Sequence, residues 1–128
     1  MTQPLWVLRE VVFAVHDQSL AQFGGAAGVR DETMLDSALG KPLNQFAYGS
    51  PSLFDLAASY GYGIVKNHPF IDGNKRTRFI VAVVFLELNG YAFCASEVDA
   101  ALQTLALAAG ELSEAAYSDW LKFNSRRS

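Results

Sequence analysis

A short polar stretch at residues 68–78, with the sequence His-Pro-Phe-Ile-Asp-Gly-Asn-Lys-Arg-Thr-Arg, separates two long apolar segments and constrains the fold more than any other part of the chain. Pro69 disfavours the α conformation of the residue before it, so His68 is biased toward extended backbone. A helix arriving from the N-terminal side should therefore end near Asn67. The sequence predicts two apolar helices joined by a short polar connection.

The second half of this stretch has the features of a helix start. Gly73 permits a bend with positive φ, and Asn74 is a favoured N-cap residue, so a helix should begin at Lys75. Lys75, Arg76 and Arg78 would lie in its first turn, where the helix macrodipole disfavours cations. Free N–H groups at a helix N-terminus bind anions, and nearby cations strengthen such a site. The pattern therefore predicts a binding site for phosphate.

Two further side chains suit chemistry on a phosphate. Asp72 offers the hard oxygen ligand that Mg²⁺ prefers when it bridges phosphate oxygens. His68 can act as a general base near neutral pH. Each residue also has a structural explanation, because His68 could merely terminate a helix, Asp72 could cap one, and the cations could be solvated. Their occurrence together in one short stretch favours function.

The stretch resembles the signature of the Fic/Doc family, His-Pro-Phe-x-(Asp/Glu)-Gly-Asn-Gly-Arg-x-x-Arg. The positions that match this signature are His68, Pro69, Phe70, Asp72, Gly73, Asn74 and Arg76. Two positions depart from it, since Lys75 replaces the second glycine and Phe79 stands where the last arginine would be. The Lys-Arg-Thr version is similar to that of the death-on-curing (Doc) branch, the toxins of toxin–antitoxin pairs. With further similar segments, the resemblance covers about residues 10–123.

The resemblance implies a role for each matching residue. His68 would deprotonate the hydroxyl group of a target side chain, Asp72 would hold Mg²⁺, and Phe70 would anchor the loop in the core. The phosphate groups of ATP would be bound by Gly73, Asn74, Lys75 and Arg76, to which we add Arg78 for its charge and position.

The Doc branch implies that the chain transfers the γ-phosphate of ATP to a hydroxyl of a cellular protein and blocks translation, with elongation factor Tu as a possible target. Most Fic enzymes instead transfer AMP. Lys75 fills the space that glycine would leave for a phosphate and adds a point charge, which is a physical reason for a different phosphorus to be attacked. AMP transfer and a catalytically silent binding module remain open alternatives.

A separate antitoxin is the expected regulator. Many Fic enzymes are inhibited by a helix with the pattern Ser/Thr-x-x-x-Glu, and this sequence contains no such pattern. The arginine with which that glutamate pairs is also replaced, by Phe79. We therefore expect a partner protein that adds a segment over the site or beside it.

Composition is consistent with one compact domain spanning residues 1–128 in a reducing cytoplasm. Hydrophobic residues make up 51% of the chain, and Cys94 is the only cysteine. The net charge of −3 argues against direct binding to nucleic acid. The longest apolar run, residues 79–86, is too short to cross a membrane, and we recognise no secretion signal.

Apolar periodicity predicts an all-α fold, a compact helical bundle of the Fic/Doc type with about six helices around a buried central helix. The expected helices span residues 8–23, 31–40, 53–67, 76–89, 96–109 and a last segment capped by Ser113, and residues 76–89 form the central one. Within the helix at 96–109, the expected inner face consists of Val98, Leu102 and Leu105.

Two expectations concern residues outside the signature. Residues 41–52 have no clear period, which predicts either a surface loop or a flap beside the active site. In the second case Phe46 and Tyr48 would bind the target protein. His16 lies within the first helix and has no motif around it, so we expect a structural role for it.

Overall fold

The computed structural model describes residues 3–128, apart from the side chains of residues 97, 104 and 108. The helices in this part of the chain are α1 (Arg9–Phe23), α2 (Glu32–Tyr48), α3 (Leu53–Asn67), α4 (Asn74–Leu88), α5 (Glu97–Ala108) and α6 (Glu114–Phe123). The short strands β1 (Tyr91–Phe93) and β2 (Ser125–Arg127) pair in antiparallel fashion, which the sequence analysis did not predict. The prediction of an all-α fold with about six helices is confirmed.

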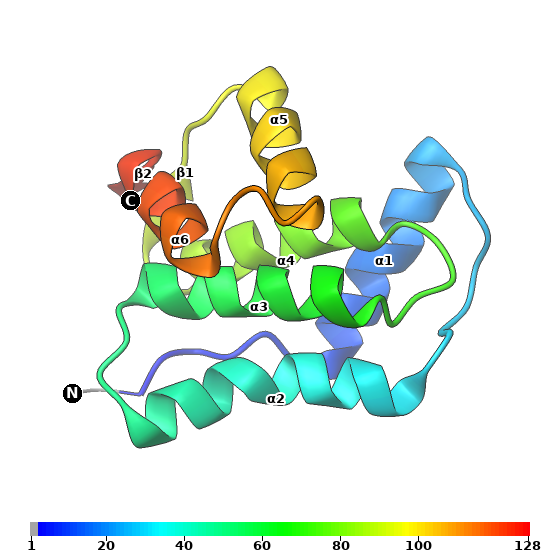
Figure 1. Cartoon of the computed structure of the whole chain (residues 1–128), viewed down its shortest axis with the longest axis horizontal. Helices are drawn as coiled ribbons and strands as arrows, with labels where there is room; N and C mark the ends of the chain where they lie inside the picture. Colours follow the sequence, from blue (N-terminus) through cyan, green and yellow to red (C-terminus); the bar gives the residue numbers. More distant parts are fainter. Residues whose placement is uncertain (1–2) are drawn as a thin grey trace.

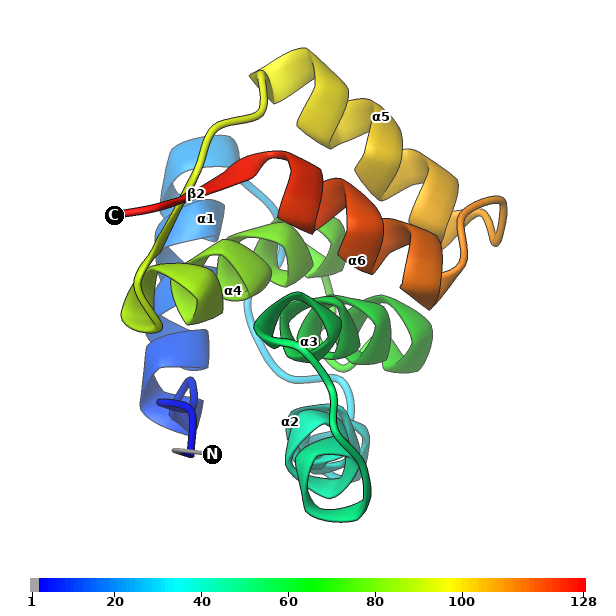
Figure 2. The same cartoon turned by 90° about the vertical axis from the view of Figure 1, so that its left-hand side faces the viewer.

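Helices α3 and α4 together form the centre of the molecule. Helix α3 packs against α2, α4, α5 and α6, whereas α4 packs against α1, α3, α5 and β1. In Figure 1, α2 and α3 run side by side in opposite directions. Figure 2 shows that α5 and α6 cover the side of the α3–α4 pair that faces away from α2. The predicted central helix, α4, therefore shares the centre with α3.

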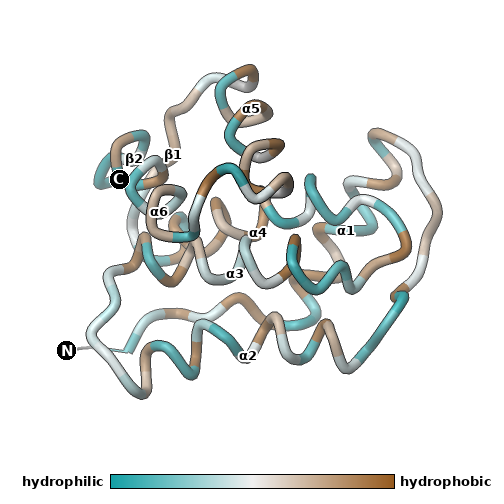
Figure 3. Tube along the Cα trace, viewed as in Figure 1, coloured by the Kyte–Doolittle hydropathy of each residue, from teal (hydrophilic) through white to brown (hydrophobic). Residues whose placement is uncertain are grey.

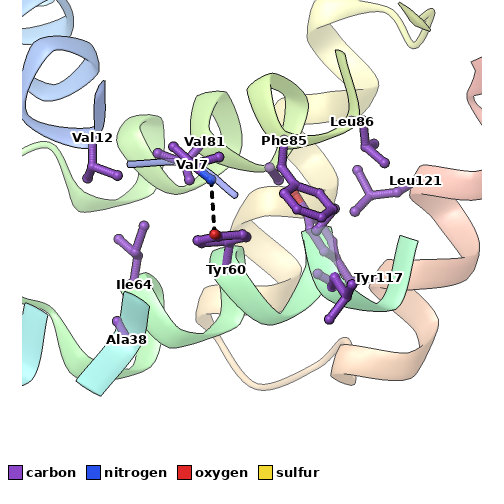
Figure 4. Packing of buried hydrophobic residues seen from close by; sticks show 14 of the residues in the cluster. Val7, Val12, Ala38, Tyr60, Ile64, Val81, Phe85, Leu86, Tyr117 and Leu121 are labelled. Carbon is purple, nitrogen blue, oxygen red and sulfur yellow. Dashed lines mark hydrogen bonds between the residues drawn. The ribbon is translucent and has the colours of Figure 1, made fainter. Parts of the chain in front are cut away.

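The core consists of apolar side chains from these helices and from the extended N-terminal segment (Figure 4). The backbone N–H of Val7 donates a 3.1 Å hydrogen bond to the hydroxyl of Tyr60, which ties that segment to the middle of α3. Figure 3 shows apolar and polar residues alternating along α2 and α5, as expected of helices with one face in solvent. Within residues 3–128, no helix combines the length and the apolar character needed to cross a membrane.

Side-chain caps set the starts of four helices. Hydroxyl or carboxylate oxygens accept hydrogen bonds from backbone N–H groups three residues further on, which satisfies donors that a helix start leaves unpaired. These capping residues are Asp31, Ser52, Ser96 and Ser113. The predicted starts of α2, α5 and α6 are confirmed.

The prediction of an irregular segment at residues 41–52 is wrong for residues 41–48, because α2 continues past Gly40 to Tyr48 and includes Pro42. Proline removes one helical hydrogen bond, but Pro42 is buried, and packing of α2 along α3 outweighs that cost. Phe46 packs edge-on against Trp6 with ring centroids 5.7 Å apart, and Tyr48 is exposed. Both lie at the end of α2 that is farther from the α3–α4 connection (Figure 1), so they form no flap beside it.

The predicted inner face of α5 is also wrong, since Val98, Leu102 and Leu105 are 72%, 59% and 54% exposed. The inner face instead carries Ala100 and Leu107. The orientation of α5 is set at its start, where the carboxylate of Asp99 accepts a 2.8 Å hydrogen bond from the indole N–H of Trp120 in α6. An apolar strip of α5 therefore faces outward.

Candidate active site

Helix α3 ends at Asn67, as predicted, and presents His68 at its C-terminus. The backbone of His68 is left-handed, with φ 51° and ψ 54°, and its N–H donates a 3.0 Å bond to the carbonyl of Ile64. The expectation of extended backbone at His68 is thus wrong, because a left-handed cap satisfies one more carbonyl at the helix end. The His68 side chain is exposed to solvent.

The loop between α3 and α4 is closed by Asn74. Its side-chain oxygen accepts a 3.0 Å bond from the N–H of Phe70, and its side-chain nitrogen donates a 2.9 Å bond to the carbonyl of Phe70. Gly73, with φ 78°, occupies the N-cap position, and Asn74 is the first helical residue, only 3% exposed. The prediction that Asn74 caps a helix beginning at Lys75 is therefore wrong by one residue, because the amide group holds the loop instead.

The N-terminus of α4 consequently has no side-chain cap among the described residues. Its first backbone hydrogen bond runs from the N–H of Thr77 to the carbonyl of Gly73, at 3.0 Å. The N–H groups of residues 74–76 precede that bond, and such groups at a helix start, with the partial positive charge of the helix end, attract anions.

Asp72 projects from the same loop with its carboxylate held by backbone donors. Oδ1 accepts a 2.8 Å bond from the N–H of Gly73, and Oδ2 accepts a 3.3 Å bond from the N–H of Ala26. These bonds, that from Gly73 above all, lower the pKa of Asp72, so the group is ionised at neutral pH.

The surroundings of Asp72 decide which kind of metal site fits. Among residues 3–128, no cluster of three or more His, Cys, Asp or Glu side chains could hold a metal by itself. One ionised carboxylate beside an anion site suits an ion that takes its remaining ligands from phosphate oxygens and water, which is how Mg²⁺ usually binds. The residues present therefore fit Mg²⁺ bound together with a nucleotide.

His16 of α1 and the buried Phe70 connect the loop to the core. Phe70 is fully buried, and its ring stacks on the imidazole of His16 with centroids 3.9 Å apart. The Nε2 of His16 lies 2.8 Å from the backbone carbonyl of Asp72, to which it donates a hydrogen bond. The structural role predicted for His16 is confirmed. Its hydrogen bond holds the backbone of the loop in place at Asp72.

The segment 24–31 runs alongside the loop, a neighbour that the sequence analysis missed. Val29 and Phe70 form an antiparallel bridge, and the N–H of Ile71 donates a 3.1 Å bond to the carbonyl of Gly28. The Gly-rich composition of the segment is a signal for irregular backbone, but it does not reveal which distant loop lies beside it. Extended chain does border the site, as the flap hypothesis required, but it comes from the α1–α2 connection.

The three predicted cations have different environments. Lys75 is exposed at the start of α4. The guanidinium of Arg76 bonds to the hydroxyl of Ser19 (3.1 Å) and the carbonyl of Gly24 (3.0 Å). Arg78 is fully buried over the ring of Tyr117, 4.8 Å from its centroid, and burial lowers the pKa of Arg78. The prediction that Arg78 binds phosphate is therefore wrong, because its side chain points into the core.

Two adjoining cavities lie at this loop. The first has a volume of about 390 Å³ and is lined by His68, Asp72, Gly73, Asn74, Lys75 and Arg76. The second, of about 570 Å³, shares three of these residues and gains an apolar wall from Leu102 and Leu105 of α5. The structure thus gathers the predicted base, acidic ligand and phosphate-binding residues, and leaves out Arg78, Phe46 and Tyr48. The α5 wall was missed because its residues were expected to face inward.

Comparisons with known proteins identify the family of this chain. The model of the Fic/DOC family matches residues 6–86, more than half of the chain. A protein of Escherichia phage P1 named Protein kinase doc is 32% identical over 114 residues, covering 88% of this chain and 90% of that protein. A Mycolicibacterium smegmatis protein named Toxin Doc is 41% identical over 83 residues, covering 62% of this chain and 63% of that protein. The chain therefore belongs to the Fic/DOC family.

Proposed function

We propose that this chain is the toxin of a toxin–antitoxin pair and transfers the γ-phosphate of ATP to a hydroxyl side chain of a cellular protein. Similar proteins are named as a protein kinase and as a toxin. The observation that carries the proposal is the cavity in which His68, Asp72 and Lys75 meet at the N-terminus of α4. This combination offers a base, a hard anionic ligand and a phosphate site within one loop.

The phosphate groups of ATP would lie at the start of α4. The uncapped N–H groups of residues 74–76 supply donors, and Lys75 supplies a mobile positive charge. Arg76 lines the same cavity but is bonded to Ser19 and Gly24, so it contributes mainly through its charge. Asn74 contributes its backbone N–H, because its side chain is bonded to Phe70.

The nucleoside would occupy the second cavity. Leu102, Leu105 and Val65 give this cavity an apolar lining, and it adjoins the phosphate site at Lys75. An apolar wall next to a few polar groups is typical of pockets for a base and its sugar. The outward-facing apolar strip of α5 would therefore bind the nucleoside of ATP.

In the proposed reaction, His68 accepts the proton of the target hydroxyl while that oxygen attacks the γ-phosphorus. The bond between the γ-phosphorus and the bridging oxygen breaks, and ADP leaves with the electron pair. Mg²⁺, which Asp72 would hold, supplies charge neutralisation at the phosphate oxygens. The amides at the α4 N-terminus and Lys75 stabilise the charge that remains on the phosphates.

AMP transfer is the second candidate. The two cavities lie on a continuous surface at His68, so a triphosphate placed in the reverse direction would present its α-phosphorus to the same imidazole. Incubation of the chain with extract proteins and ATP labelled at either position separates the two reactions. Label transferred from the γ position supports the kinase; label transferred only from the α position contradicts it.

We propose two protein partners. The target, with elongation factor Tu as the first candidate, would place an extended segment beside residues 24–31 and the loop, rather than at Phe46 and Tyr48. A cognate antitoxin would restrain the toxin in the cytoplasm by laying a segment over the site. A complex in which activity is blocked while the surroundings of His68 stay uncovered would count against this placement of the antitoxin.

A further inference from the structure

We propose that Arg30 is a positioning residue that holds the backbone of His68 in its reactive conformation. The geometric part of this inference stands on the structure, and its catalytic consequence rests on the proposed function. Arg30 lies in the segment between α1 and α2, far from residues 68–78 in sequence. It is distinct from every residue in the signature motif.

Arg30 binds three consecutive carbonyl groups at the end of α3. Its Nε donates a 2.7 Å bond to the carbonyl of His68, and its terminal Nη2 donates a 2.9 Å bond to the carbonyl of Asn67. Its backbone N–H donates a 2.6 Å bond to the carbonyl of Pro69. One residue therefore satisfies the last acceptors of the helix and the first acceptor of the loop.

These carbonyls are the ones that need a partner. The C-terminus of a helix leaves acceptors unpaired and carries a partial negative charge, so a cation that donates hydrogen bonds there is favourable. His68 adopts φ 51°, which is the only positive φ of a non-glycine residue in the described part of the chain. A left-handed conformation is unfavourable for such a residue and persists when its surroundings hold it.

The imidazole of His68 depends on this support. Its ring has no hydrogen-bond partner among the described residues, and the side chain is exposed. The backbone of residue 68, which Arg30 binds, therefore sets where the Cβ atom of His68 lies and which positions its ring can reach. A base displaced by as little as about 1 Å loses much of its effect in catalysis.

The choice of arginine follows from the spacing of the acceptors. Nε and Nη2 form a rigid planar fork that donates to the two neighbouring carbonyls at once. A lysine has one donor nitrogen without the fixed fork geometry, and a glutamine would lose the charge as well. Because Arg30 is exposed, its replacement should affect local geometry more than overall stability.

Arg9 provides a matched control. It is the first residue of α1, and its guanidinium bonds to Glu32 and Asp36 of α2 and lies over the ring of Phe13. In the described part of the chain, its guanidinium bonds to those two carboxylates and not to residues 67–69. Arg9→Gln therefore removes a partly exposed arginine that ties α1 to α2 and leaves the carbonyls of the loop untouched.

The experiment compares the wild-type chain with Arg30→Gln, Arg30→Lys, Arg9→Gln and His68→Ala. The rate of phosphate transfer and the KM for ATP are measured, and backbone NMR chemical shifts report the conformation of residues 67–69. We expect Arg30→Gln to lower kcat by about 10- to 100-fold with little change in KM for ATP. The NMR shifts of residue 68 should leave the left-handed range. The kcat of Arg30→Lys should lie between those of Arg30→Gln and the wild type. Arg9→Gln should match the wild type in both kcat and NMR shifts.

Three results would overturn the inference: wild-type kcat in Arg30→Gln, a lower kcat without movement of residues 67–69, or an equal loss in Arg9→Gln. Failure of the proposed function is a separate outcome, seen as no transfer by the wild type or unchanged transfer by His68→Ala. In that event the NMR comparison alone decides whether Arg30 holds the backbone of His68.

Discussion

Gly61 of α3 lies directly against Arg78 of α4, since a Cβ atom added to Gly61 would be 2.7 Å from the Cδ of Arg78. The same Cβ would also approach Tyr117, whose ring lies under the guanidinium. A glycine in the middle of a helix is unfavourable by itself, but here it makes room for a buried arginine. Close packing of α3 on α4 at this position compensates for that cost.

The first prediction concerns Gly61→Ala, which should destabilise the chain by about 1–3 kcal/mol because it overpacks the contact with Arg78. Gly40→Ala in α2 is the control, since a Cβ there meets no atom within 4 Å. That substitution should stabilise the chain by up to about 1 kcal/mol through helix propensity. Urea unfolding measures both, and equal stability of the two variants would contradict the prediction.

The second prediction is that Arg78→Met stabilises the chain by about 1–3 kcal/mol, because it removes buried donors that have no partners. The Nε, Nη1 and Nη2 atoms of Arg78 are all buried without a hydrogen-bond acceptor among the described residues. Transfer activity should be retained, since Arg78 lines neither cavity at the loop. A loss of ATP binding in a stable Arg78→Met protein would restore the role in phosphate binding.

The third prediction is that Gly25→Ala and Gly24→Ala differ in their requirement for Mg²⁺. A Cβ on Gly25 would be 2.8 Å from Oδ2 of Asp72, whereas a Cβ on Gly24 meets nothing within 4 Å. Both glycines have positive φ, so alanine strains the backbone at either position. We expect both variants to lose stability, and only Gly25→Ala to need more Mg²⁺ for half-maximal transfer. Equal Mg²⁺ requirements would show that the position of Asp72 is unimportant.

The fourth prediction is a dependence of stability on pH. A hydrogen bond from Ser118 and those from Ser52 lower the pKa of Asp55 in α3. A depressed pKa contributes stability above the unfolded value of about 3.9, and this contribution is lost as pH falls through the folded value. Asp55→Asn should therefore cost about 1 kcal/mol at neutral pH. The difference in unfolding free energy between Asp55→Asn and the wild type should become smaller when urea unfolding is measured at lower pH. A difference that does not change with pH would contradict this assignment.

Local chemistry is the part of this fold that the sequence predicts well. Asp31, Ser96 and Ser113 start helices as expected, because a cap depends on residues three positions away. The loop at residues 68–78 is also a local unit, and its base, its acidic residue and Lys75 meet in one cavity as predicted.

Tertiary packing accounts for the errors. Helix α2 continues past Gly40 because α3 covers it, and α5 turns Leu102 outward because Asp99 is tied to Trp120. Arg78 lies within the signature stretch in sequence, but the helical turn directs it toward Gly61 and the core. The contact of Arg30 with His68 joins segments that are distant in sequence, so no local pattern indicates it.

The most direct test of the account is the intact mass of a purified target, with elongation factor Tu as the first candidate, after incubation with the chain, ATP and Mg²⁺. Reactions with the wild type and with His68→Ala are compared. The account predicts that the wild type adds the mass of one phosphate and that His68→Ala adds nothing. Addition of the mass of AMP, or the same phosphate addition by His68→Ala, would contradict it.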